Sequence, residues 1–112
     1  MSSVLEQRCE RLRQPVTELV AVSISATLRP QDLPELRAAI ADVRAILGED
    51  NSEIPPGAFL DWLPTALRNL QRMDEAVAGG DAATSYAILT DKVDGFIRLT
   101  DGCAGFPGWS AT

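Results

Sequence analysis

The sequence predicts an all-α fold, an antiparallel up-down-up-down four-helix bundle formed by a single domain over residues 1–112. Apolar residues recur at alternating steps of three and four in four separate stretches of the chain. Strong helix formers dominate the composition, and runs of β-branched residues are scarce. A chain of 112 residues can bury one modest core. The clearest of the four stretches is carried by Phe59, Leu63, Ala66, Leu70, Met73 and Val77.

The first predicted helix covers residues 3–28, because the same spacing runs without a phase change from Leu5 to Ala26. Pro15 lies inside this stretch and has no backbone N–H to donate. It therefore marks either a kink or a separate short turn before the main helix, and the unbroken phase favours the kink.

The second predicted helix covers residues 33–47. Asp32 is a good N-cap residue in front of it, and Gly48 supplies a stop behind it. The segment 49–57 that follows is acidic and contains two adjacent prolines, so it is predicted to be the longest connection.

The third predicted helix covers residues 58–78, with Pro64 marking either a kink or the true first turn. Two glycines end it, and Asp81 caps a fourth helix over 82–102. Gly95 lies inside that fourth helix, at a cost of about 1 kcal/mol relative to alanine. The short connections favour antiparallel neighbours.

The formal net charge is −6, which argues against nucleic acid or an anionic membrane surface as a partner. The basic cluster of Arg8, Arg11 and Arg13 is interspersed with glutamates, so we interpret it as a solvated helix face. No stretch is long and apolar enough to span a bilayer, and the first residues lack the apolar core of a signal peptide. A cytoplasmic location is therefore expected, unless an export signal has been removed from the chain.

The chain contains no histidine, which excludes Ser–His and Cys–His nucleophilic pairs and imidazole-dependent zinc or haem sites. We expect no catalytic residues, no metal and no cofactor. The acidic residues flank the apolar stretches, as solvated side chains do. Arg68 and Arg72 lie one turn apart, within reach of Asp91 or Asp94 across the last helical hairpin, and an ion pair there would be a surface pair that stabilises the fold little.

Cys9 and Cys103 both fall on predicted buried positions, at the same end of an up-down-up-down bundle. Three interpretations stay open. Reduced packing residues fit a cytoplasmic protein. A disulfide would join the two ends of the domain, and a catalytic thiol is the third.

The segment after the fourth helix holds Phe106 and Trp109 among glycines. These aromatic side chains either fold back as a latch over the end of the bundle, cover the lip of a pocket, or contact a partner.

The second half of the chain resembles the C-terminal hairpin of cytochrome c′-type bundles. The resemblance is carried by the apolar spacing of residues 58–78, the junction at 78–81, and a last helix that runs into Cys103. In that family the last helix ends in Cys-x-x-Cys-His. Here Phe106 stands at the second cysteine and Pro107 at the axial histidine. The resemblance therefore implies the bundle architecture without covalent haem.

Two main functions follow as hypotheses, and the first is a non-enzymatic binding module. Its partner would be another protein or a second copy of the chain, and an immunity or regulatory protein is a special case. A bundle of this size has few aromatic side chains to leave in solvent, so exposed ones indicate an interface. The candidate contacts are Phe59, Trp62, Phe106 and Trp109.

The alternative is a small helical carrier or enzyme that holds an apolar small molecule between its helices. Its pocket is expected where the predicted core positions are small, with Tyr86 or Thr100 as polar contacts to the ligand. Those small positions are Ser23, Ala26, Ala39 and Ala66.

Overall fold

The computed structural model describes residues 3–104 and Trp109. These residues form an all-α structure without strands, as predicted, and the first three long helices begin and end within one residue of the predicted bounds. The elements in chain order are α1 (Val4–Leu28), the 3₁₀ helix η1 (Pro30–Asp32), α2 (Leu33–Leu47), α3 (Ala58–Ala78), α4 (Ala82–Leu89) and α5 (Ile97–Gly102).

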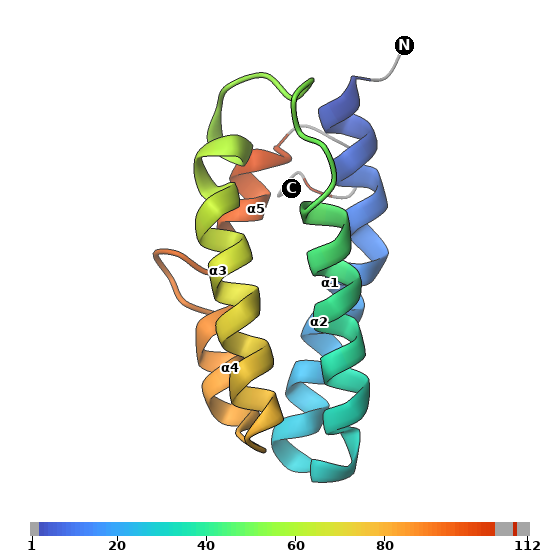
Figure 1. Ribbon diagram of the computed structural model, residues 1–112, viewed down its shortest axis with the longest axis vertical. Coiled ribbons are helices and arrows are strands. Elements are labelled where there is room, and N and C mark those ends of the chain that lie inside the picture. Colours follow the sequence, from blue (N-terminus) through green and yellow to red (C-terminus); the bar gives the residue numbers. More distant parts are fainter. Residues whose placement is uncertain (1–2, 105–108, 110–112) are drawn as a thin grey trace.

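Figure 1 shows α1, α2 and α3 lying along the long axis of the molecule, each reversing the direction of the one before it. α1 packs on α2 and on α4, while α3 packs on α2, α4 and α5. Pro15 and Pro64 lie inside α1 and α3, so neither proline starts its helix.

The helices enclose one hydrophobic core in which the apolar stretches of all four predicted segments meet. Trp62 lies in this core, 1% exposed, with its ring edge-on to that of Phe96 at a centroid distance of 5.0 Å. The other large side chains that are almost wholly buried are Leu12, Leu19, Leu36, Ile40, Leu47, Leu70, Met73, Leu89 and Leu99.

The prediction of one continuous helix over 82–102 is wrong, because α4 ends at Leu89 and α5 begins at Ile97. The Asp91 carboxylate accepts hydrogen bonds from the backbone N–H groups of Val93 and Asp94, at 2.8 and 2.9 Å. In a continuing helix the Leu89 carbonyl would accept from Val93. It accepts instead from the N–H of Phe96 at 3.0 Å. The Asp91 side chain thus accepts hydrogen bonds from backbone N–H groups that would otherwise donate to helix carbonyls, and this favours a turn over a continuing helix.

Gly95 is required by this interruption rather than tolerated inside a helix. A Cβ atom at this position would lie 2.3 Å from the carbonyl oxygen of Asp91 and 2.7 Å from that of Leu89. Both are backbone atoms, so the turn itself would have to move.

We expect Gly95→Ala to lower the free energy of unfolding by about 2 kcal/mol, since the added methyl group overpacks a fixed turn. Chemical denaturation followed by circular dichroism measures the change. Gly79→Ala is the matched control, because a Cβ there meets its nearest backbone oxygen at an ordinary 3.5 Å. Equal stability of the two variants would contradict this explanation of Gly95.

Arg8 does not belong to the solvated face on which the sequence placed it. Its side chain is buried, and its guanidinium donates to the carbonyl oxygen of Asp50 at 2.9 Å and to the side-chain oxygen of Asn51. A third, longer bond of 3.5 Å reaches the carbonyl oxygen of Ile46. Arg8 therefore holds α1 to the end of α2 and to the connection that follows it.

Arg11 and Arg13 do lie on an exposed face, as expected. Arg11 forms a two-bond ion pair with Glu49, at 2.6 and 2.5 Å. This hydrogen bonding lowers the pKa of the Glu49 carboxyl below its usual value. Arg13 pairs with Glu10 on its own helix, at 3.2 Å.

The pKa of four carboxyls is lowered by hydrogen bonds that stabilise the ionised form, and the four are Glu49, Asp50, Asp81 and Asp91. The unfolded chain then binds more protons than the folded one in acid, so stability rises with pH in that range. We expect unfolding free energies to stay level near neutral pH. They should fall as the pH drops through the usual values of 4.5 for glutamate and 3.8 for aspartate. A rise on acidification, measured by urea unfolding, would contradict the assignment.

Candidate functional site

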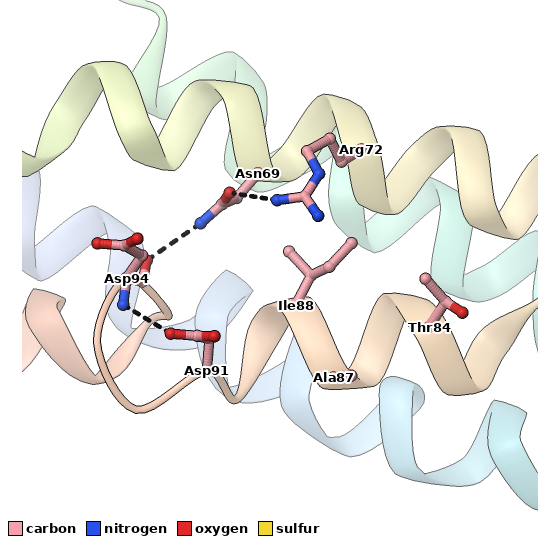
Figure 2. A pocket seen from close by; sticks show the side chains of 7 residues that line it. All are labelled: Asn69, Arg72, Thr84, Ala87, Ile88, Asp91 and Asp94. Carbon is pink, nitrogen blue, oxygen red and sulfur yellow. Dashed lines mark hydrogen bonds between the residues drawn. The ribbon is translucent and has the colours of Figure 1, made fainter.

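A cleft of about 320 Å³ opens between α3 and α4, beside the interruption that separates α4 from α5. Figure 2 shows Asn69 and Arg72 on one wall, residues of α4 on the other, and the connecting loop at one end. The lining residues are Asn69, Arg72, Thr84, Ala87, Ile88, Asp91 and Asp94.

The polar groups at the loop end of this cleft stabilise the loop itself. The Asn69 amide donates to the carbonyl oxygen of Asp94 at 3.1 Å, and the Trp62 indole donates to the same oxygen at 3.0 Å. The Asn69 side-chain oxygen accepts from Arg72 at 3.4 Å. Asp91 accepts from the loop backbone, and these bonds lower its pKa, so it holds no proton to donate at neutral pH. The cleft thus contains no evident acid–base or nucleophilic pair.

Among the described residues, neither Arg68 nor Arg72 forms the predicted ion pair with Asp91 or Asp94, although the positive charge of Arg72 helps the hydrogen bonds to lower the pKa of Asp91. In the described part of the chain, Asp94 pairs instead with Arg98, at 3.6 Å. This is a consequence of the helix break, which turns the Asp94 backbone toward α3 and leaves its carboxylate near α5.

Four of the five aromatic residues named from the sequence can be placed. Phe59 and Trp62 are 2% and 1% exposed, so the prediction that they contact a partner is wrong; the core uses both as large packing residues. Tyr86 is half-buried, and its spacing from Thr84 places it on the side of α4 away from the cleft. Phe106 lies outside the described residues.

Trp109 folds back onto α1. It is half-buried against the core, and its indole N–H donates to the carbonyl oxygen of Cys9 at 2.8 Å. Together with Arg13, Val16 and Thr17 it borders a small cleft on the surface of α1. Trp109 therefore folds back as the latch interpretation predicts and also borders a cleft, while its contact with a partner stays a prediction.

Cys9 and Cys103 are joined by a disulfide, with a sulfur–sulfur distance of 2.07 Å and both residues fully buried. The bond connects α1 to the residue that follows α5. No group of histidine, cysteine or acidic side chains within residues 3–104 and Trp109 is arranged to hold a metal ion.

The residues proposed to line a pocket for an apolar ligand border none of the four clefts found among the described residues at Asn69, Ile40, Trp109 and Leu33. Ala26, Ala39 and Ala66 are part of the packed core. Thr100 is exposed and donates to the carbonyl oxygen of Ile97 on its own helix. Ser23 is fully buried, and its hydroxyl has no hydrogen-bond partner among the described residues.

A row of exposed apolar side chains lies on α1, and it was not predicted from the sequence. Val20, Ile24 and Leu28 are 37%, 47% and 79% exposed. They follow one another at steps of four, so they lie along one side of the helix. We call these three residues the apolar stripe. A signal was present, because no charged residue occurs between Glu18 and Arg29.

Two further exposed apolar residues, Val93 and Ile97, lie in the loop between α4 and α5 and at the start of α5. They are separated in sequence from the apolar stripe, and the loop that carries Val93 projects from the far side of α3 in Figure 1.

No protein-family model, curated protein or solved structure matches this chain. The relationship to cytochrome c′ therefore stays a prediction. No helix in the described part of the chain is long and apolar enough to cross a membrane.

Proposed function

We propose that this protein is a non-enzymatic binding module that docks another protein chain on the apolar stripe of α1. Its scaffold is an up-down-up-down bundle whose fourth helix is broken between Leu89 and Ile97. The observation that carries the proposal is the exposure of three large aliphatic side chains in one row on a 25-residue helix. Single exposed apolar residues are ordinary, whereas a contiguous row indicates an interaction surface.

The other side of α1 already serves the fold. Leu12, Leu19 and Ala26 are buried against the other helices, and the apolar stripe lies outside this buried core. A helix with apolar side chains on two sides buries one side in its own fold, and the second side is available to pack against another chain. Residues 19–28 contain no charge, so a partner helix can approach without burying an unpaired ion.

The disulfide supports the location of this protein in an oxidising compartment. Bonds of this kind persist in secreted and periplasmic proteins and are rare in the cytosol. This differs from the cytoplasmic location expected from the sequence, and it predicts that the chain isolated from its source contains no free thiol.

Ile24→Asp tests the docking surface, because a carboxylate in the middle of the apolar stripe would be buried without a counterion on binding. Val93→Asp is the matched control, since Val93 is also an exposed aliphatic residue, at 73%, outside the apolar stripe. Each immobilised chain is exposed to an extract of its source supplemented with labelled soluble chain.

We expect at least one protein, or the labelled chain itself, to be retained by the wild type and by Val93→Asp but lost with Ile24→Asp. Thermal unfolding should show that both variants are as stable as the wild type, because both side chains are exposed. Identical retention by all three chains would contradict the proposed surface.

A further inference from the structure

We propose that the partner on the apolar stripe is a second copy of this chain, packed antiparallel across a twofold axis that passes through Ile24. The proposal rests on the docking function proposed above and specifies its occupant.

Charge favours a contact between copies at this place. Each chain carries a net charge of −6, so two copies repel one another over most approaches. The charge-free segment 19–28 is the exception, because it brings no carboxylate of one copy against a carboxylate of the other. A pair of copies that meets there gains apolar burial without an unpaired buried charge.

The spacing of the apolar stripe makes it complementary to itself. Its three members are separated by equal steps of four, so reversing the helix superimposes the row on itself. Ile24 then faces Ile24 of the second copy, and Val20 faces Leu28 of the second copy. Such a self-complementary patch is the arrangement that a twofold interface requires.

The exposed fractions favour the antiparallel direction over the parallel one. Val20 is recessed, at 37% exposed, whereas Leu28 projects, at 79%. In the antiparallel pair each projecting Leu28 meets a recessed Val20. In a parallel pair the two leucines would meet each other and hold the valines apart, and poorly matched surfaces of that kind bind weakly.

The size of the face predicts a weak, reversible dimer. Residues 17–28 extend over about 18 Å of helix. A standard stable interface buries about 800 Å² of each partner. That is about an eighth of the 6391 Å² of accessible surface of this chain, which is more than three side chains on one short stretch of helix supply. Trp109 limits the face, because it already occupies the preceding part of α1 around Val16 and Thr17.

Sedimentation velocity over a range of protein concentrations tests the dimer with the intact, oxidised chain. We expect a reversible monomer–dimer equilibrium that strengthens with added salt, because salt screens the repulsion between the two negative chains. Ile24→Asp should weaken the dimer at least about tenfold, as expected for a central interface residue. Val93→Asp should leave it unchanged. A wild type that stays monomeric at every concentration would overturn the proposal.

Cysteine cross-linking tests the direction of packing. Two Ile24→Cys chains should be joined by oxidised glutathione, because the two positions meet on the axis; the two thiols lose two electrons and two protons as glutathione is reduced. Val20→Cys mixed with Leu28→Cys should give the mixed dimer in excess over either homodimer. An excess of the two homodimers would show parallel packing and overturn the proposal.

Different results would refute the docking surface and the second copy as its occupant. A monomeric wild type that still retains a different protein through Ile24 would keep the docking surface and refute the second copy as occupant. A monomeric wild type whose retained proteins are unaffected by Ile24→Asp would refute both.

Discussion

Replacing Cys9 and Cys103 together by alanine is expected to lower the free energy of unfolding by about 4 kcal/mol. The two residues are 94 positions apart in sequence, so their bond closes almost the whole chain into a loop. A closed loop has far fewer unfolded conformations, and for a loop of this length the chain-entropy estimate is about 4 to 5 kcal/mol. A chain of 112 residues has a total stability of only about 5 to 15 kcal/mol. The loss would therefore leave a marginal fold.

Guanidinium unfolding of the double variant and of the wild type measures this effect, and the slope of the transition should rise as the unfolded state expands. Reduced wild type is the control for packing, because its two thiols still occupy the core positions of the bonded sulfurs. If reduced and oxidised wild type unfold at the same denaturant concentration, the disulfide does not stabilise the fold.

Arg8→Met is expected to cost about 3 kcal/mol of unfolding free energy, the second largest effect. Methionine keeps much of the aliphatic stem but removes every donor of the guanidinium. The carbonyl oxygen of Asp50 and the side chain of Asn51 then lose their partner in a partly buried place, beside the buried stem of residue 8. Unsatisfied buried polar groups cost about 1 to 3 kcal/mol each.

Arg11→Met is the matched control, since Arg11 lies on the same helix and also binds the connection after α2, through Glu49. Its guanidinium is exposed, and exposed ion pairs stabilise proteins little. Thermal unfolding should show a clear decrease for Arg8→Met and almost none for Arg11→Met. Equal decreases would mean that the burial of Arg8 is not what makes it important.

The sequence predicts α1, α2 and α3 closely because their signals are local. Each has an unbroken row of apolar residues at helical spacing, and glycines follow α2 and α3 at their C-terminal ends. The N-cap signals are less uniform. Asp81 caps α4 through the N–H of Thr84, whereas Asp32 does not cap α2 and instead accepts from Ser25.

The break between α4 and α5 is not predictable from local spacing, because apolar residues continue at steps of three and four across it. Asp91 and Gly95 permit a turn, but each also occurs inside ordinary helices. The interruption is fixed from outside the segment, by Trp62 and Asn69 of α3, which both donate to the carbonyl oxygen of Asp94. Tertiary contacts of this kind override a local helical preference.

The candidate surface consists of aliphatic side chains, whereas the sequence prediction placed the partner contacts on aromatic ones. Phe59 and Trp62 are needed to fill the core, and a small domain has no larger side chains for that purpose. The apolar stripe is visible only when both sides of α1 are compared, since Val20 and Ile24 lie beside core positions in sequence. Sequence spacing alone does not say which of two apolar sides faces the other helices.

Concentration-dependent amide shifts in the nuclear magnetic resonance spectrum of the oxidised chain test the central claim most directly. As the chain is concentrated, the signals that move should belong to residues 17–28 of α1. Those of the loop around Val93 should stay in place. Shifts confined to that loop, or no shifts in α1 at any concentration, would contradict the claim that copies of this chain meet on the apolar stripe.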